Sequence, residues 1–118
     1  MANTFKNMTL RGDSINADTL TNVGDFGGTS NAVADGSQIT LIGMTIANIT
    51  SGVINVGIKL INASNETWLV KDAPIPTGGS LIALGGDQKV CLMTGDIIKV
   101  KSNTASSADV IMSFLEIT

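Results

Sequence analysis

Apolar and polar side chains alternate along residues 53–61, and this alternation constrains the fold more than any other feature of the sequence. Successive side chains of a β-strand point to opposite faces, so the pattern predicts a strand with one apolar and one polar face. The apolar face would consist of Ile54, Val56, Ile58 and Leu60. No stretch of about ten or more residues has the period of a helix instead.

Further segments rich in Ile, Val, Thr and Leu follow one another at the spacing typical of sandwiches and barrels. They comprise residues 38–49, 66–72, 80–84, 89–93, 96–101 and 109–117, with 5–10 as a further candidate and a bulge expected within 41–43. The segment 109–117 is apolar on both faces, which predicts a central strand or one covered by a neighbouring subunit. The sequence therefore predicts an all-β chain: a single-domain antiparallel β-sandwich of seven or eight strands, jelly-roll-like in arrangement.

The first part of the chain differs in composition from the rest. Residues 16–37 are rich in Gly, Asn and Asp and carry only scattered apolar side chains, although 18–23 could pair as an edge strand. Loops of this length are commonly functional or ordered by a partner. We expect an N-terminal arm and long loop over 1–37, in the same domain as a β-sandwich core over 38–118.

The side chains on which most enzymes depend are scarce. The chain has no histidine and only two glutamates, and it shows no Ser/His/Asp, Cys/His or phosphate-binding signature. We therefore expect no enzyme activity, no catalytic residue and no cofactor. Seven basic residues spread singly in a chain of net charge −3 argue against a nucleic-acid partner. No apolar run approaches the roughly 20 residues of a membrane helix, so no membrane association is expected.

Three features invite a chemical interpretation but favour a structural one. One polar segment offers oxygen ligands of the kind that calcium prefers, but their spacing does not match a calcium loop, so we predict no metal site. These ligands would be Asp13, Asn16, Asp18, Asn22 and Asp25. The single Trp68 is favoured as a core or interface anchor over a sugar-stacking platform. Cys91 lies in an apolar run, which predicts a buried and unreactive thiol.

Several motifs together suggest a family. They are MANTFKN (1–7), LVKDAPIPTGG (69–79), LGGDQKV (84–90), TGDIIKVKSNTASS (94–107) and FLEIT (114–118). In these segments the chain resembles small all-β virion structural proteins of tailed bacteriophages, with the closest likeness to phages that infect cyanobacteria and other aquatic bacteria. It departs from their pattern within residues 16–37, where Gly, Asp and Asn replace a short strand and a T-V-Y-x-x-P turn.

The resemblance implies a multicopy, non-enzymatic β-sandwich located in the virion and assembled in the host cytoplasm. We expect a capsid decoration (cement) protein, a homotrimer that docks on the lattice of the major capsid protein and stabilises it. The alternative is a neck, tail or baseplate subunit or a fibre-attachment adaptor, and a second alternative is a receptor- or glycan-binding module. The residues expected to contact partners are Phe5, Leu10, Phe26, Ile75 and Ile117.

Overall fold

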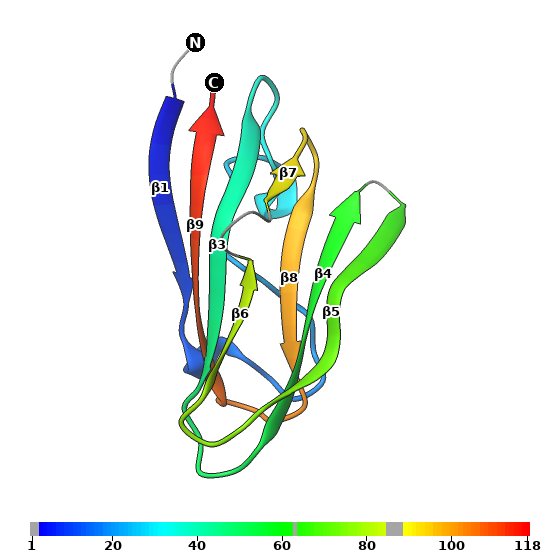
Figure 1. Cartoon of the computed structure of the whole chain (residues 1–118). Coiled ribbons are helices and arrows are strands. Elements are labelled where there is room, and N and C mark those ends of the chain that lie inside the picture. The colour runs from blue at the N-terminus through cyan, green and yellow to red at the C-terminus, as the bar shows by residue number, and fades with distance from the viewer. Residues whose placement is uncertain (1–2, 63, 85–88) are drawn as a thin grey trace.

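The computed structural model describes residues 3–62, 64–84 and 89–118, which form two antiparallel β-sheets with a shared apolar core (Figure 1). The first sheet has the order β1-β9-β3-β6, and β7 also pairs with β3. Its strands are β1 (Asn3–Leu10), β3 (Gln38–Asn48), β6 (Ser80–Leu84), β7 (Val90–Leu92) and β9 (Ala108–Ile117). The second sheet has the order β2-β8-β4-β5. Its strands are β2 (Thr21–Asn22), β4 (Ile54–Asn62), β5 (Asn65–Ile75) and β8 (Ile97–Ser102).

The all-β sandwich predicted from the sequence is confirmed. The described residues form nine strands, one more than the predicted seven or eight. The additional strand is the two-residue β2, which lies within the segment 18–23 that could pair as an edge strand. Two 3₁₀ turns, η1 (Gly12–Ser14) and η2 (Thr29–Asn31), complete the regular structure, and none of the described residues lies in an α-helix. No helix in this part of the chain has the length and hydropathy that a bilayer span requires.

Two details of the strands agree with the sequence analysis, and a third departs from it. The apolar β9 lies between β1 and β3, which confirms the central position expected from its two apolar faces. The register of β3 against β9 shifts between Leu41 and Gly43, where the bulge was expected. Strand β5 runs three residues beyond the predicted end because Pro74 lies on an edge strand, where a missing backbone N–H breaks no ladder.

The N-terminal residues belong to the sandwich. Strand β1 pairs with β9 from Asn3 to Leu10, so residues 3–10 form an edge strand of the first sheet. The irregular segment 11–37 then contributes buried side chains to the core. Phe26 is 4% exposed and packs edge-on against Phe114, with ring centroids 5.4 Å apart. The expectation that Phe26 contacts a partner is therefore corrected, because its ring fills the core.

Ile75 is likewise a core residue and not an exposed turn residue as expected. It pairs with Ile54 at the end of β5 and is only 1% exposed. The turn that follows is held against β3 by Asn48, whose side-chain amide donates hydrogen bonds to the carbonyl oxygens of Ile75 and Pro76 at 2.9 and 3.2 Å. The Pro-rich turn signal correctly marked a reversal of the chain, but this anchoring buries the isoleucine that begins it.

Candidate protein interaction face

The outward side chains of the first sheet form a surface with very little charge. Along β9 the inward positions are Val110, Met112 and Phe114, which are buried, so the residues between them point outward. Register then fixes the outward positions of the neighbouring strands. We call this surface the uncharged face. It comprises Phe5, Asn7, Thr9, Thr40, Thr45, Ile82, Cys91, Ile111, Ser113, Leu115 and Ile117.

Apolar side chains on this face lie in rows that cross the sheet. In one row Ile111 of β9 is flanked by Thr9 of β1 and Thr45 of β3, and Thr45 is paired in turn with Ile82 of β6. Ile82 is 70% exposed and Ile111 is 48% exposed. Single exposed apolar residues are normal on a protein surface, whereas rows of them without intervening charge mark interaction surfaces.

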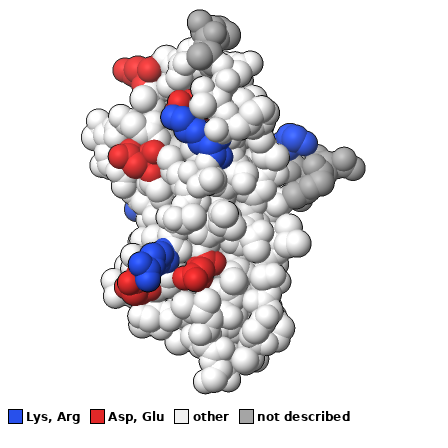
Figure 2. All heavy atoms as spheres, turned by 90° about the vertical axis from the view of Figure 1, so that its left-hand side faces the viewer, with Lys and Arg blue, Asp and Glu red and all other residues white. Residues whose placement is uncertain are grey.

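A second row lies nearer the end of the sheet at which β9 terminates. Phe5 of β1 is opposite Leu115 of β9, which is opposite Thr40 of β3, and Thr40 pairs with Cys91 of β7. Phe5 is 76% exposed, the largest exposed fraction among the large apolar side chains described as exposed. Seen from the side of β1, the surface carries only small, scattered groups of charged side chains (Figure 2).

The charges at the margins of the uncharged face are engaged within the chain. At one end the Asp109 carboxylate accepts a hydrogen bond from the Gly12 backbone N–H at 2.7 Å. Lys6 and Glu116 occupy inward positions of β1 and β9, so their ion pair at 2.9 Å does not place charge on this face. A partner could therefore cover the centre of the face without burying an unpaired charge, which is the costly event at an interface.

A hollow of about 330 Å³ opens beside Asp109 on this face. It lies between β1, β9 and β3 and is lined by Thr9, Leu10, Arg11, Thr45, Ala47, Asp109, Val110 and Ile111. Leu10, one of the expected contact residues, is half-buried and packs on the core from the inner side of β1. It also lines this hollow.

Two of the five expected contact residues lie on the uncharged face itself, namely Phe5 and Ile117. The sequence analysis missed Ile82 and Ile111, which lie on the same face. Ile111 was hidden because β9 is apolar on both faces, so alternation alone does not show which side of the strand points outward. The structure settles this because Val110 and Met112 are buried.

Cys91 corrects a further expectation. The sequence predicted a buried thiol, but the side chain is exposed. In β7 the neighbouring Leu92 is buried, and alternation turns Cys91 outward, opposite Thr40. Its apolar neighbours in sequence therefore pack on the core while the thiol itself lies on the uncharged face.

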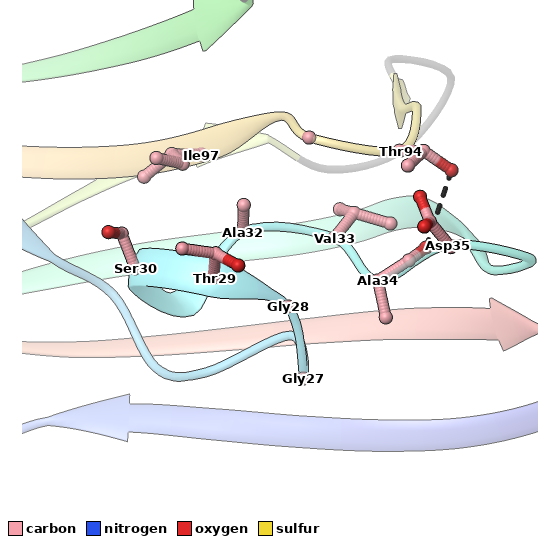
Figure 3. Close-up of a pocket in the computed structure, with 11 residues that line it drawn as sticks. Gly27, Gly28, Thr29, Ser30, Ala32, Val33, Ala34, Asp35, Thr94 and Ile97 are labelled. Carbon is pink, nitrogen blue, oxygen red and sulfur yellow. Dashed lines mark hydrogen bonds between the residues drawn. The ribbon is translucent and has the colours of Figure 1, made fainter.

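A larger hollow lies elsewhere, around η2 and the turn before β8, with a volume of about 850 Å³ (Figure 3). Among the described residues, Asp35 is the one ionisable residue of its lining. The other lining residues are Gly27, Gly28, Thr29, Ser30, Ala32, Val33, Ala34, Thr94, Gly95 and Ile97. The Thr94 hydroxyl donates to the Ala34 carbonyl oxygen at 3.3 Å (Figure 3). One carboxylate without a second titratable group does not provide an acid–base pair for catalysis.

Among the acidic residues that suggested calcium, Asp25 serves local structure, and so does Asp96, which was not in that set. The Asp25 carboxylate accepts from the Gly27 backbone N–H at 2.7 Å, which is an Asx turn. The buried Asp96 accepts from the Asn62 amide at 2.6 Å and from the Met93 backbone N–H at 2.9 Å. Within the described ranges, no three His, Cys, Asp or Glu side chains come together as metal ligands.

No protein-family profile matches the chain, and no curated protein does either. Two solved structures align with 95% of it at 15% sequence identity and a TM-score of 0.36, and both are described as a pentameric capsid protein isolated from metagenomic phage sequences. The chain spans 59% of the length of one and 63% of the other. At this TM-score the architectures agree only loosely, so no function is transferred from these proteins.

Proposed function

We propose that this chain is a non-enzymatic, multicopy structural protein of a tailed-phage virion, and specifically a capsid decoration (cement) protein. The observation that carries the proposal is the uncharged face, where Phe5, Ile82 and Ile111 expose much of their apolar surface to water. The sequence motifs that resemble small virion proteins, including the Pro-rich turn at residues 74–79 and the C-terminal FLEIT, agree with this role. In the particle the face would be covered by the major capsid protein or by sibling copies.

The energetics of the face favour repeated weak contacts. Burying a large apolar side chain contributes about 1.5–3 kcal/mol, so the exposed parts of Phe5, Ile82 and Ile111 would contribute on the order of 4 kcal/mol together. Association itself costs about 4 kcal/mol or more, so one such contact in solution is weak. On a lattice, an oligomer such as a homotrimer engages several contacts at once, and the effective concentration of the second and third is high. Docking across subunit junctions would then stabilise the shell.

The strand order supports the finer description of the fold as a jelly roll. The orders β1-β9-β3-β6 and β2-β8-β4-β5 place consecutive strands in alternate sheets at both ends of the chain. Strands β6 and β7 both pair with β3 and so occupy the position of one interrupted strand. With those two counted together, this strand order supports an eight-stranded double-sheet jelly roll, an architecture that recurs in viral capsid domains.

A neck, tail or baseplate location is the second candidate within the same class. The number of copies per particle separates the two, since a decoration protein occurs in hundreds of copies and a neck or tail protein in small multiples of three or six. Quantitative mass spectrometry of purified particles measures this number directly. Absence of the chain from the particles would refute the virion assignment altogether.

The position of Trp68 argues against the second alternative, a receptor- or glycan-binding module. The indole is only half-buried, but it lies against Gly57, and the ammonium groups of Lys59 and Lys101 lie over its ring at 4.6 and 5.4 Å from the centroid. A sugar that stacks on this ring would have to displace them.

The role of the uncharged face is tested by the double substitution of Ile82 and Ile111 to lysine. We expect the variant to fold but to lose association with particles, because it places two charges at the centre of the face. The matched control replaces Ile49 and Val53 by lysine, since these residues are also exposed apolar side chains, at 52% and 63%, but flank the turn between β3 and β4. Cosedimentation of each variant with particles assembled without the chain gives the comparison. Equal loss in both variants, or in neither, would contradict the proposal.

A further inference from the structure

The outer face of the second sheet concentrates positive charge, although the chain as a whole is acidic. Lys59 of β4 lies directly opposite Lys99 of β8, and Lys101 of β8 lies opposite Gly57. These three lysines are nearly half of the seven basic residues in a chain of net charge −3. Together with Trp68 of β5 they form what we call the lysine–tryptophan patch.

The absence of a side chain at Gly57 lets the Trp68 ring lie within this patch. Gly57 is buried beneath the indole, and a Cβ atom at this position would lie 2.7 Å from Cζ3 of the ring. The missing side chain lets the ring lie close to the backbone of β4, where Lys59 and Lys101 reach it as cation–π partners. The aromatic ring and the ammonium groups are therefore held in one surface.

The charge of the patch is only partly compensated. Glu66 forms an ion pair with Lys59 at 2.6 Å, but among the described residues Lys99 and Lys101 have no ion-pair partner. Like charges directly opposite each other destabilise a sheet, so the juxtaposition of Lys59 and Lys99 is a cost for the isolated chain. An anionic partner would relieve this cost.

The pKa of Glu66 reflects the positive charge of the patch. The hydrogen bond from Lys59 and the charge of Lys59 lower the pKa of this exposed carboxyl group, and the charge of Lys99 lowers it further. A carboxylate delivered by another molecule would meet the same two cations and, in addition, Lys101.

We propose that the lysine–tryptophan patch binds an acidic polypeptide segment of a partner protein. Carboxylates of that segment pair with Lys99 and Lys101, and its backbone or a neighbouring side chain packs on the exposed part of Trp68. A polypeptide is favoured over a nucleic acid because nucleic-acid surfaces carry a long stripe of Lys and Arg on a basic domain, whereas this patch is small, lacks Arg and belongs to an acidic chain. Since this patch and the uncharged face lie on opposite sheets, one subunit could bridge two neighbours.

The test uses the intact chain and a fluorescein-labelled peptide of alternating Glu and Gly. Fluorescence anisotropy should show binding that weakens as NaCl is raised from about 50 to about 500 mM, because exposed ion pairs are screened by salt. The double substitution Lys99→Gln/Lys101→Gln should weaken binding about tenfold, as expected for the loss of two surface ion pairs. The matched control, Lys6→Gln/Arg11→Gln, changes the net charge equally at β1 and at the residue that follows it, away from the patch, and should stay within about twofold.

Three outcomes would overturn the proposal. Equal weakening in both double variants would mean that only the net charge matters. Tighter binding of a single-stranded oligothymidylate of the same charge would make the patch a nucleic-acid site. No binding of the peptide by the native chain at low salt would remove the site. None of these outcomes bears on particle association through the uncharged face, so the two proposals fail separately.

Discussion

Replacing Asn48 by alanine should destabilise the protein more than any single change at its surface. The side chain is 5% exposed and links three segments of the chain. Its amide nitrogen donates to the carbonyl oxygens of Gly52, Ile75 and Pro76 at 2.7, 2.9 and 3.2 Å. Its carbonyl oxygen accepts from the backbone N–H and the hydroxyl of Thr50 at 2.9 and 2.7 Å.

The size of the effect depends on which of these groups can return to water. Gly52 and Thr50 lie in the exposed turn between β3 and β4 and can be rehydrated, so the loss of their bonds costs little. The bond to Ile75 is buried, and an unsatisfied buried carbonyl costs about 1–3 kcal/mol in addition to about 1 kcal/mol for each lost bond. We therefore expect the alanine variant to lose about 3 kcal/mol of unfolding free energy. For a domain of this size, that corresponds to a melting temperature lower by roughly 10 °C or more.

Thermal and urea denaturation followed by circular dichroism measure the effect. Thr50→Ala is the control, because it removes only a partly exposed hydroxyl, and it should cost less than about 1 kcal/mol. Asn48→Asp should be at least as damaging as alanine, since a carboxylate oxygen would replace the donor that faces three carbonyl oxygens. If Asn48→Ala melted within about 2 °C of the native chain, the anchoring of the Pro-rich turn by this residue would be refuted.

Three further predictions concern the two outer faces. Gly57→Ala should displace the Trp68 ring, seen as a shift of its fluorescence emission, and an unchanged spectrum would show that the ring does not rest on the glycine. The pKa of Glu66 is depressed in the folded state, so its ion pair contributes at neutral pH and is lost as the pH falls through that lowered pKa. Lys59→Gln should raise the pKa of Glu66 toward its ordinary value in an NMR titration, and an unmoved pKa would mean that Lys59 is not the main cause. The Cys91 thiol should react with an uncharged maleimide in the native, dilute protein about as fast as in the unfolded chain, and protection there would contradict its outward orientation.

The alternation of side chains made most strands predictable. Residues 53–61 were expected as a strand, and β4 runs over Ile54–Asn62. The segment 80–84 was predicted with the bounds of β6, and the bulge expected within 41–43 coincides with the register shift of β3 against β9. A period of two residues is set by the backbone alone, so it can be read without knowledge of the partner strands.

Side-chain burial in turns was less predictable, because it depends on contacts between segments that are distant in sequence. Ile75 is buried through an amide located at Asn48, and Phe26 is buried because the segment 11–37 closes over Phe114. No local pattern in either segment contains this information. The same limit applied to the candidate site: the sequence identified Phe5 and Ile117, but it did not place Ile82 and Ile111 on the same face.

The edge strands show why association through the uncharged face is favoured over pairing of sheet edges. Within the described part of the chain, each edge strand carries a feature that discourages a further strand. Strands β2, β6 and β7 are short, at two, five and three residues. In β1, Lys6 occupies an inward position opposite the buried Phe114, and an inward charge at an edge is a recognised barrier to pairing.

Strand β5 is protected differently. Its register against β4 shifts on both sides of Ile58, Asp72 adopts a φ of +53°, and Pro74 lacks a backbone donor. Bulges and proline twist or interrupt an edge so that a neighbouring strand cannot extend the ladder. A sandwich whose edges are all protected, while one broad face lacks charge and exposes Phe5 and Ile82, is suited to packing through that face. Edge-to-edge growth would be open-ended, whereas a face covered by a neighbour leaves a subunit with one defined position in an assembly.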